Sequence, residues 1–236
     1  MKIAYIITTI RPFYLCHKTI QSIKQLDEHD HEILVISSQD FKQECSNIAN
    51  TYYIKEPGGH GSVYANNLAC KITDADWLAF LPDDFHLYNL DIYEFQRFLE
   101  GPHMEQKTFK MFSFYTRSCH LVPGQEIYTT PINRPYQVMH FPCVAHETID
   151  SKLGGVIFNH RFKHHYVDHW LGYYAAQNEK YEPYNYSVFN EGNECLLQLN
   201  NAAANITNNI FTNNDYDILA QLYQESLTNP SLPYNG

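Results

Sequence analysis

The sequence predicts an α/β fold in which a mostly parallel central sheet is flanked by helices and followed by an irregular C-terminal extension. Residues 1–85 alternate between short apolar runs and segments of helical periodicity, which is the pattern of a parallel sheet with right-handed crossovers. Of the 236 residues, 44% are hydrophobic, so the chain can bury a large core. The 6 cysteines have no C-x-x-C spacing, which indicates reduced thiols and a cytoplasmic protein.

The first half of the chain contains four predicted strands separated by helices. Each strand is a short apolar run bounded by turn-forming residues. These strands are Lys2–Thr9, Glu32–Ser38, Tyr52–Lys55 and Trp77–Pro82. The helices between them are predicted at Tyr14–Leu26, at Phe41–Ala49 and from Ser62 to about Lys71.

The second half is less regular and more aromatic. Helices are predicted at Asp91–Glu100, Val167–Asn178 and Asp215–Leu227, a strand at Phe109–Arg117, and a loop-rich stretch from Ser118 to Pro142. The Asn-rich run that begins at Asn200 divides the chain into a main domain over residues 1–199 and a helix with a tail over residues 200–236.

Charge and hydropathy exclude two classes of partner. The formal net charge is −10, and the 16 basic residues are dispersed along the chain, which argues against a nucleic-acid or anionic-membrane surface. The opening apolar run, Ile3 to Ile10, is about eight residues long, which is too short to cross a bilayer. The sequence therefore predicts no nucleic-acid partner and no membrane span.

Two adjacent carboxylates, Asp83 and Asp84, follow the apolar strand that ends at Pro82. Open α/β sheets bind ligands at the carboxyl ends of their strands. Neighbouring negative charges there cost free energy unless a cation or a donor-rich ligand lies close by. The pair therefore indicates a cation site, and an ordinary acidic β-turn is the alternative.

Glycines precede the helix that begins at Ser62. Gly58, Gly59 and Gly61 leave backbone N–H groups open to an anionic or polar ligand at the helix N-terminus. The spacing matches neither a Walker motif nor a dinucleotide fingerprint, so plain turn glycines are the alternative. Thr8, Thr9 and Arg11 lie just past the first strand and are candidate nucleotide contacts, although Arg11 could equally be a solvated loop charge.

The segment Gly61–Asp84 resembles the family 2 type of glycosyltransferase with the GT-A fold. It pairs a helix that opens on glycine and carries an Ala-x-Asn triplet, Ala65 to Asn67, with an apolar strand that ends in aspartates. Further along, Leu153–Phe162 and Tyr166–Leu171 resemble the Gly-Gly turn of the family, its aromatic segment and the acidic residue that heads a helix. These matches cover roughly residues 1–175 and imply a GT-A catalytic domain over residues 1–199.

The resemblance implies a sugar transfer from a UDP, GDP or TDP type of donor to a hydroxyl of a glycan or glycoconjugate acceptor. It implies inversion at the anomeric carbon and a requirement for Mn²⁺ or Mg²⁺. Asp84 is the implied metal ligand, Asp83 contacts the metal or the ribose, and Asp168 is the general base. A helix N-terminal acid is the alternative for Asp168. The implied donor contacts are Thr8, Thr9, Arg11, Asp40, Gly61, Asn67 and Asp83.

The chain departs from the family pattern at four places. Serines stand at 37 and 38, where relatives often carry aspartate after the second strand, and Pro82 precedes a compact acid pair in place of Asp-x-Asp. Val167 stands where many relatives have glutamate, and Tyr174 where a basic residue is frequent.

Two alternatives remain for the function. His160, His164, His165 and His169 have i, i+4 spacings that could bind zinc on a helix, which would suit a zinc-dependent hydrolase. The other alternative is a non-catalytic carbohydrate-binding module on a transferase scaffold. Four aromatic residues lie in or just after this segment: Tyr166, Trp170, Tyr173 and Tyr174. They could form a platform on which a sugar stacks, or they could belong to the hydrophobic core.

Overall fold

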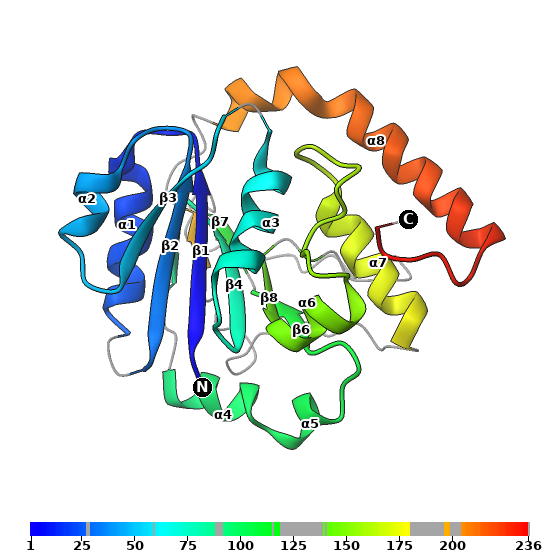
Figure 1. Cartoon of the computed structure of the whole chain (residues 1–236), viewed down its shortest axis with the longest axis horizontal. Helices are drawn as coiled ribbons and strands as arrows, with labels where there is room; N and C mark the ends of the chain where they lie inside the picture. The colour runs from blue at the N-terminus through cyan, green and yellow to red at the C-terminus, as the bar shows by residue number, and fades with distance from the viewer. Residues whose placement is uncertain are drawn as a thin grey trace, which may run out of the picture.

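A computed structural model describes residues 1–26, 29–58, 60–87, 92–114, 116–118, 139, 141–179, 196–198 and 204–235. A six-stranded sheet with the strand order β3-β2-β1-β4-β8-β6 forms its centre, with helices on both faces (Figure 1). The strands of this sheet are β1 (Ile3–Thr9), β2 (His31–Ser37), β3 (Thr51–Lys55), β4 (Trp77–Pro82), β6 (Met111–Ser113) and β8 (Pro142–Ala145). A small sheet has the order β5-β9-β7 and consists of β5 (Phe85–Leu87), β9 (Leu196–Gln198) and β7 (Thr116–Ser118).

Four neighbouring strands of the large sheet, β3, β2, β1 and β4, run parallel, and β8 is antiparallel to both β4 and β6. Thr8 of β1 lies opposite Ile36 of β2 and Pro82 of β4. The loops after these strands therefore meet at one edge of the sheet, called here the carboxyl edge. The mixed α/β class with a mostly parallel sheet is confirmed.

The helices cover the two faces of the large sheet through separate cores. Side chains of β1 alternate between them: Tyr5 and Ile7 belong to one buried cluster, and Ala4 and Ile6 to the other. The first cluster includes residues of α1 (Phe13–Lys24), α2 (Lys42–Ser46) and α4 (Ile92–Leu99), and α5 (Pro102–Glu105) follows α4 along the chain. The second cluster includes residues of α3 (Ser62–Ile72), α6 (His146–Lys152), α7 (Val167–Glu179) and α8 (Ala204–Thr228).

The second half departs from the predicted elements. The single strand predicted over 109–117 is wrong, because β6 and β7 belong to different sheets. No sequence pattern predicts β5, β8, β9, α5 or α6. Helix α8 begins at Ala204, well before the predicted start at Asp215. Asparagine favours caps and turns locally, so the Asn-rich run before Asp215 does not read as helix in the sequence. Leu219 and Leu222, in the part of the helix that the sequence predicts, are buried in the second cluster.

The C-terminal segment shares the core of the main domain. Tyr234 is buried, its hydroxyl donates to the Ile157 carbonyl at 2.7 Å, and its own carbonyl accepts from Asn159 at 2.6 Å and from the Trp170 indole at 3.1 Å. The division near residue 200 stays a prediction, because residues 199–203 lie outside the described part of the chain. Within the described ranges, no helix has the length and apolar character that crossing a bilayer requires.

Candidate active site

The acid pair lies in the turn between β4 and β5, and each of the two residues is only 5% exposed. Arg11 contacts both carboxylates: its Nε donates to Asp83 Oδ2 at 2.8 Å, its Nη1 to Asp84 Oδ2 at 3.1 Å, and its Nη2 pairs with Asp83 Oδ1. The Thr9 hydroxyl also donates to Asp83, and it accepts from the Arg11 backbone N–H at 3.0 Å. The structure therefore brings Thr9, Arg11 and the two aspartates together, as the sequence predicts.

A divalent cation of the Mg²⁺ or Mn²⁺ class fits these side chains. Both carboxylates supply hard oxygen ligands, and the phosphates of a bound nucleotide can complete such a coordination shell. Among the residues that the structure describes, no group of three His, Cys, Asp or Glu side chains is arranged to hold a metal ion. Among the described residues, the two aspartates would thus be the side chains that hold such a cation.

Thr8 and Asp40, two further predicted donor contacts, also lie at the carboxyl edge. Thr8 is partly buried near the end of β1, and Asp40 is exposed in the loop after β2. The Asp40 carboxylate accepts the Lys42 N–H at 3.1 Å at the start of α2. The side-chain amide of Gln39 donates to the Ile10 carbonyl, which joins this loop to the loop that carries Arg11.

Glu56 is a buried acid at the carboxyl edge that sequence reasoning missed. It follows β3, its N–H donates to the Ser37 carbonyl at 2.9 Å, and it is 5% exposed. Its Oε1 atom is buried without a hydrogen-bond partner. A buried acceptor without a partner costs free energy, so this oxygen could accept a hydrogen bond from a donor group of a ligand. In the sequence, the run Glu56-Pro57-Gly58 indicates only a turn, so it does not predict a buried acid at this position.

The N-terminus of α3 is covered by the histidine-rich segment. The Ser62 N–H donates to His164 Nδ1 at 3.4 Å, and the Val63 N–H donates to the Lys163 carbonyl at 3.4 Å. Burial, followed by the nearby charge of His165, lowers the pKa of His164 from its ordinary value of 6.5. A lowered pKa favours the neutral ring, whose Nδ1 can accept the bond from Ser62.

Gly61 lies where the histidine-rich segment approaches the start of α3 most closely. Its φ is +90°, and a Cβ there would lie 2.5 Å from the Lys163 carbonyl oxygen and 2.9 Å from the His164 ring. We expect Gly61→Ala to destabilise the protein by about 1–3 kcal/mol through strain and this clash. Urea denaturation would measure the loss. Gly155→Ala is the matched control, because Gly155 has a φ of +81° but no atom within 4 Å of its added Cβ. An equal loss in the two variants would contradict the role given to the clash.

The histidine-rich segment is held from its other side by Asp215 of α8. This carboxylate is 1% exposed and accepts three backbone N–H groups, from Lys163 at 3.0 Å, His164 at 2.9 Å and His165 at 2.8 Å. We call this arrangement the Asp215 clasp. Sequence reasoning missed it, because an aspartate in an Asn-rich run looks like a helix start. The clasp links α8 to the segment that covers α3.

Asn67, a predicted donor contact, is engaged within the protein. It is 8% exposed, its amide nitrogen donates to the Phe158 carbonyl at 2.7 Å, and its amide oxygen accepts the Phe158 N–H at 2.9 Å. These two bonds attach α3 to the chain that follows the Gly154-Gly155 turn. The side chain therefore positions the second resemblance segment against the first.

Asp168, the predicted base, is partly buried in the first turn of α7. Two residues earlier, Tyr166 has a φ of +60°, which is an unusual backbone conformation for a bulky side chain and is often found at functional sites. Trp170 of the same helix is fully buried and stacks on Tyr173 and Tyr234. The interpretation of Trp170 as core is confirmed, and its interpretation as a sugar platform is wrong.

The four histidines do not form among themselves the zinc site that is the alternative interpretation of this segment. His160, His164, His165 and His169 are all described, and none of them belongs to a group of three metal-ligating side chains in the described ranges. His160 is exposed, while His164 caps α3. Within the described ranges, this segment therefore offers no three-ligand site of the kind that a zinc-dependent hydrolase uses.

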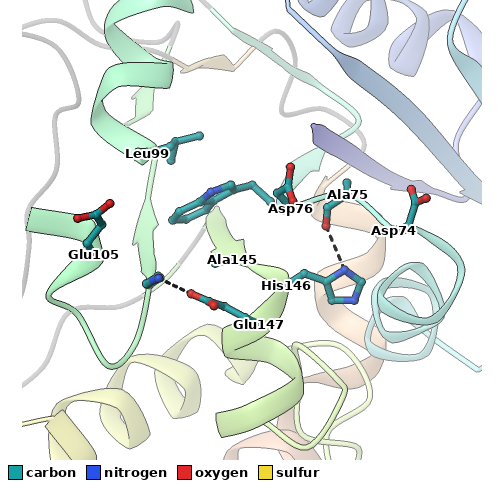
Figure 2. A pocket seen from close by; sticks show the side chains of 10 residues that line it. Asp74, Ala75, Asp76, Leu99, Glu105, Ala145, His146 and Glu147 are labelled. Atoms are coloured by element: carbon teal, nitrogen blue, oxygen red, sulfur yellow. Dashed lines mark hydrogen bonds and ion pairs between the residues drawn. The ribbon is translucent and has the colours of Figure 1, made fainter. Parts of the chain in front are cut away.

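A hollow of about 270 Å³ lies at the opposite edge of the sheet. Figure 2 shows Asp74, Asp76, His146 and Glu147 around it, with the His146 ring bonded to the Ala75 carbonyl at 3.0 Å. Trp77, which also lines the hollow, begins β4, whereas the acid pair follows the other end of that strand. The hollow is therefore separate from the candidate site.

The chain matches no protein-family model and no curated protein, but its fold is similar to solved structures. TarS 1–349 from S. aureus has a TM-score of 0.63 at 12% identity, over 84% of this chain and 60% of that one. Its complex with UDP has a TM-score of 0.63 at 12% identity, over 85% and 61%. The mannosyltransferase PcManGT from Pyrobaculum calidifontis, in complex with GDP-Man and Mn²⁺, has a TM-score of 0.50 at 14% identity, over 68% and 48%.

The chain spans 60% of the length of TarS 1–349 and 48% of PcManGT, so it corresponds to a part of each protein. At 12% to 14% identity the similarity concerns the fold, and membership of family 2 stays a prediction. The six-stranded sheet and its flanking helices match a GT-A-like architecture. The chain therefore has the α/β fold of the GT-A type that these structures share.

Proposed function

We propose that this protein is a glycosyltransferase that moves a sugar from a nucleoside diphosphate to an acceptor hydroxyl. The observation that carries the proposal is the buried acid pair at the carboxyl edge of β4, in a fold of the GT-A type. Open α/β sheets bind ligands at this edge. A structural neighbour bound to UDP and another bound to GDP-Man with Mn²⁺ support the same class of donor.

Each part of the site has a proposed role. Asp84 and Asp83 would hold Mn²⁺ or Mg²⁺, which supplies positive charge against the diphosphate leaving group when bound. Asp168 takes the proton from the acceptor hydroxyl. The acceptor oxygen then bonds to the anomeric carbon as the bond from that carbon to the phosphate oxygen breaks, and the configuration inverts. The proposed donor contacts are Thr8, Thr9, Arg11, Asp40, Gly61 and Asp83.

The proposed donor is a UDP, GDP or TDP sugar, and the proposed acceptor is a glycan or glycoconjugate. We also propose that the protein works in the cytoplasm. Four described cysteines are buried free thiols, Cys16, Cys45, Cys70 and Cys143, and unpaired thiols persist in a reducing compartment.

Isothermal titration with UDP, GDP and TDP sugars, each with and without Mn²⁺, tests this proposal. We expect one nucleotide to bind, and Mn²⁺ to strengthen its binding. The double variant Asp83→Asn/Asp84→Asn should lose the effect of Mn²⁺, because its neutral amides lack the negative charge with which the carboxylates attract the cation. A folded protein that binds none of the nucleotides would exclude the transferase. Binding of a glycan without transfer from any donor would favour the non-catalytic module.

A further inference from the structure

We propose that the Arg11 guanidinium neutralises the acid pair while no metal ion is bound, and that it moves to the donor diphosphate when a divalent ion binds the two aspartates. We call the group formed by Arg11, Thr9, Asp83 and Asp84 the latch. The inference rests on the proposed function, because it assumes a nucleoside diphosphate as the ligand. It goes beyond that function because it states how the two ligands affect each other: the protein binds the divalent cation weakly when the cation is alone and strongly when the diphosphate is also bound.

The burial of the acid pair requires a positive charge in the absence of ligand. The side chains of Asp83 and Asp84 are 8% and 6% exposed, and that of Arg11 is 19% exposed. Two adjacent carboxylates with so little solvent strongly disfavour each other's charge unless a cation lies between them. The guanidinium reaches both carboxylates with three of its nitrogens, so it supplies that charge.

The same oxygens cannot serve the guanidinium and a metal ion fully. Arg11 uses Asp83 Oδ1, Asp83 Oδ2 and Asp84 Oδ2, which are three of the four carboxylate oxygens that these residues can offer to a hard cation. A cation that arrives alone must therefore separate the guanidinium from its partners. This competition weakens the binding of the cation.

A diphosphate removes that cost by giving Arg11 a new partner. The guanidinium fork matches phosphate oxygens in geometry and charge. The two aspartates and a divalent ion carry no net charge together, so the freed guanidinium is left to neutralise the phosphates. Cation and diphosphate should then strengthen each other's binding, and this coupling must be reciprocal.

The backbone around Arg11 restricts the change to the side chain. Its N–H is bonded to the Thr9 hydroxyl at 3.0 Å, and the neighbouring Ile10 carbonyl accepts from Gln39. Pro12 follows directly and precedes α1. Because the loop is tied at these points, the guanidinium moves by rotation of its own side chain.

Titration of Mn²⁺, followed by electron paramagnetic resonance of the free ion, tests the latch. The titration uses the full chain as wild type and as Arg11→Met and Arg11→Lys, each alone and with UDP, GDP or TDP. We expect Mn²⁺ alone to bind Arg11→Met about tenfold more tightly than wild type, because the buried acids have lost their counter-charge. Arg11→Lys should lie between the two, because an ammonium cannot bridge both acids as a fork.

The nucleotide should strengthen Mn²⁺ binding about tenfold or more in wild type and much less in Arg11→Met, because coupling constants of this order are typical. Arg161→Met is the matched control and should behave as wild type. Arg161 also forms a two-bond ion pair, at 2.7 and 3.3 Å, but with Glu225 of α8. Circular dichroism establishes that each variant is folded.

Two results are decisive in different ways. Equal affinity of wild type and both Arg11 variants for Mn²⁺ alone would overturn the latch, whatever the nucleotide does. Tighter Mn²⁺ binding by Arg11→Met, with no nucleotide bound to any variant, would support competition at the acid pair and reject both the transfer to a diphosphate and the proposed function. If Arg11→Met fails to fold, the comparison of Arg11→Lys with wild type decides the question.

Discussion

Asp168→Asn is expected to lower the rate of sugar transfer by about 10²–10⁴-fold, which is the usual contribution of a general base. The amide keeps the shape of the side chain but cannot take the proton of the acceptor hydroxyl. Donor binding should change little, because the proposed donor contacts are other residues. Transfer rates at saturating donor, together with calorimetric nucleotide affinity, would measure both effects.

Asp168 lies in the first turn of α7, where a negative charge interacts favourably with the helix dipole and stabilises the helix by about 0.3–1 kcal/mol. The melting temperature of the variant separates this effect from catalysis. Asp150→Asn provides a control, because Asp150 is an exposed aspartate on the neighbouring helix α6. Turnover of Asp168→Asn at the wild-type rate would remove this residue from the base role and leave it as a helix N-terminal acid.

Asp215→Ala is expected to destabilise the fold by about 2–4 kcal/mol, because three backbone N–H groups lose the buried carboxylate that accepts from them. The loss should spread to the candidate site, since the clasp holds the segment that caps α3. Urea denaturation measures the free energy of unfolding. Hydrogen exchange at Lys163, His164 and His165 reports whether these N–H groups have become accessible.

Asp217→Ala is the control for this variant, because Asp217 is exposed on the same helix. Asp215→Asn should fall between the two, since its amide oxygen retains part of the acceptor capacity. Formate should restore part of the stability of Asp215→Ala by occupying the cluster of N–H groups, which is suited to anions. A loss no larger than that of Asp217→Ala would show that the clasp contributes little to stability.

Local patterns determined much of the first half. The strand Trp77–Pro82 was predicted with its observed bounds, and the helix after Gly61 with an end about one residue short. These elements depend on short-range periodicity, burial and turn chemistry. The order of a parallel sheet brings the ends of β1 and β4 together, so the sequence also indicated that Thr9, Arg11 and the acid pair share one edge.

The sequence by itself determined the α/β class, the alternation of strands and helices, and the place of the acid pair at the end of a buried strand. Only the tertiary structure decided that Arg11 pairs with Asp83, 72 residues away, and that Asp215 holds His165, 50 residues away. It also decided that Glu56 is buried with an unpartnered oxygen. The reason is that periodicity records the environment of neighbouring residues, whereas contacts between distant charges depend on how the elements pack.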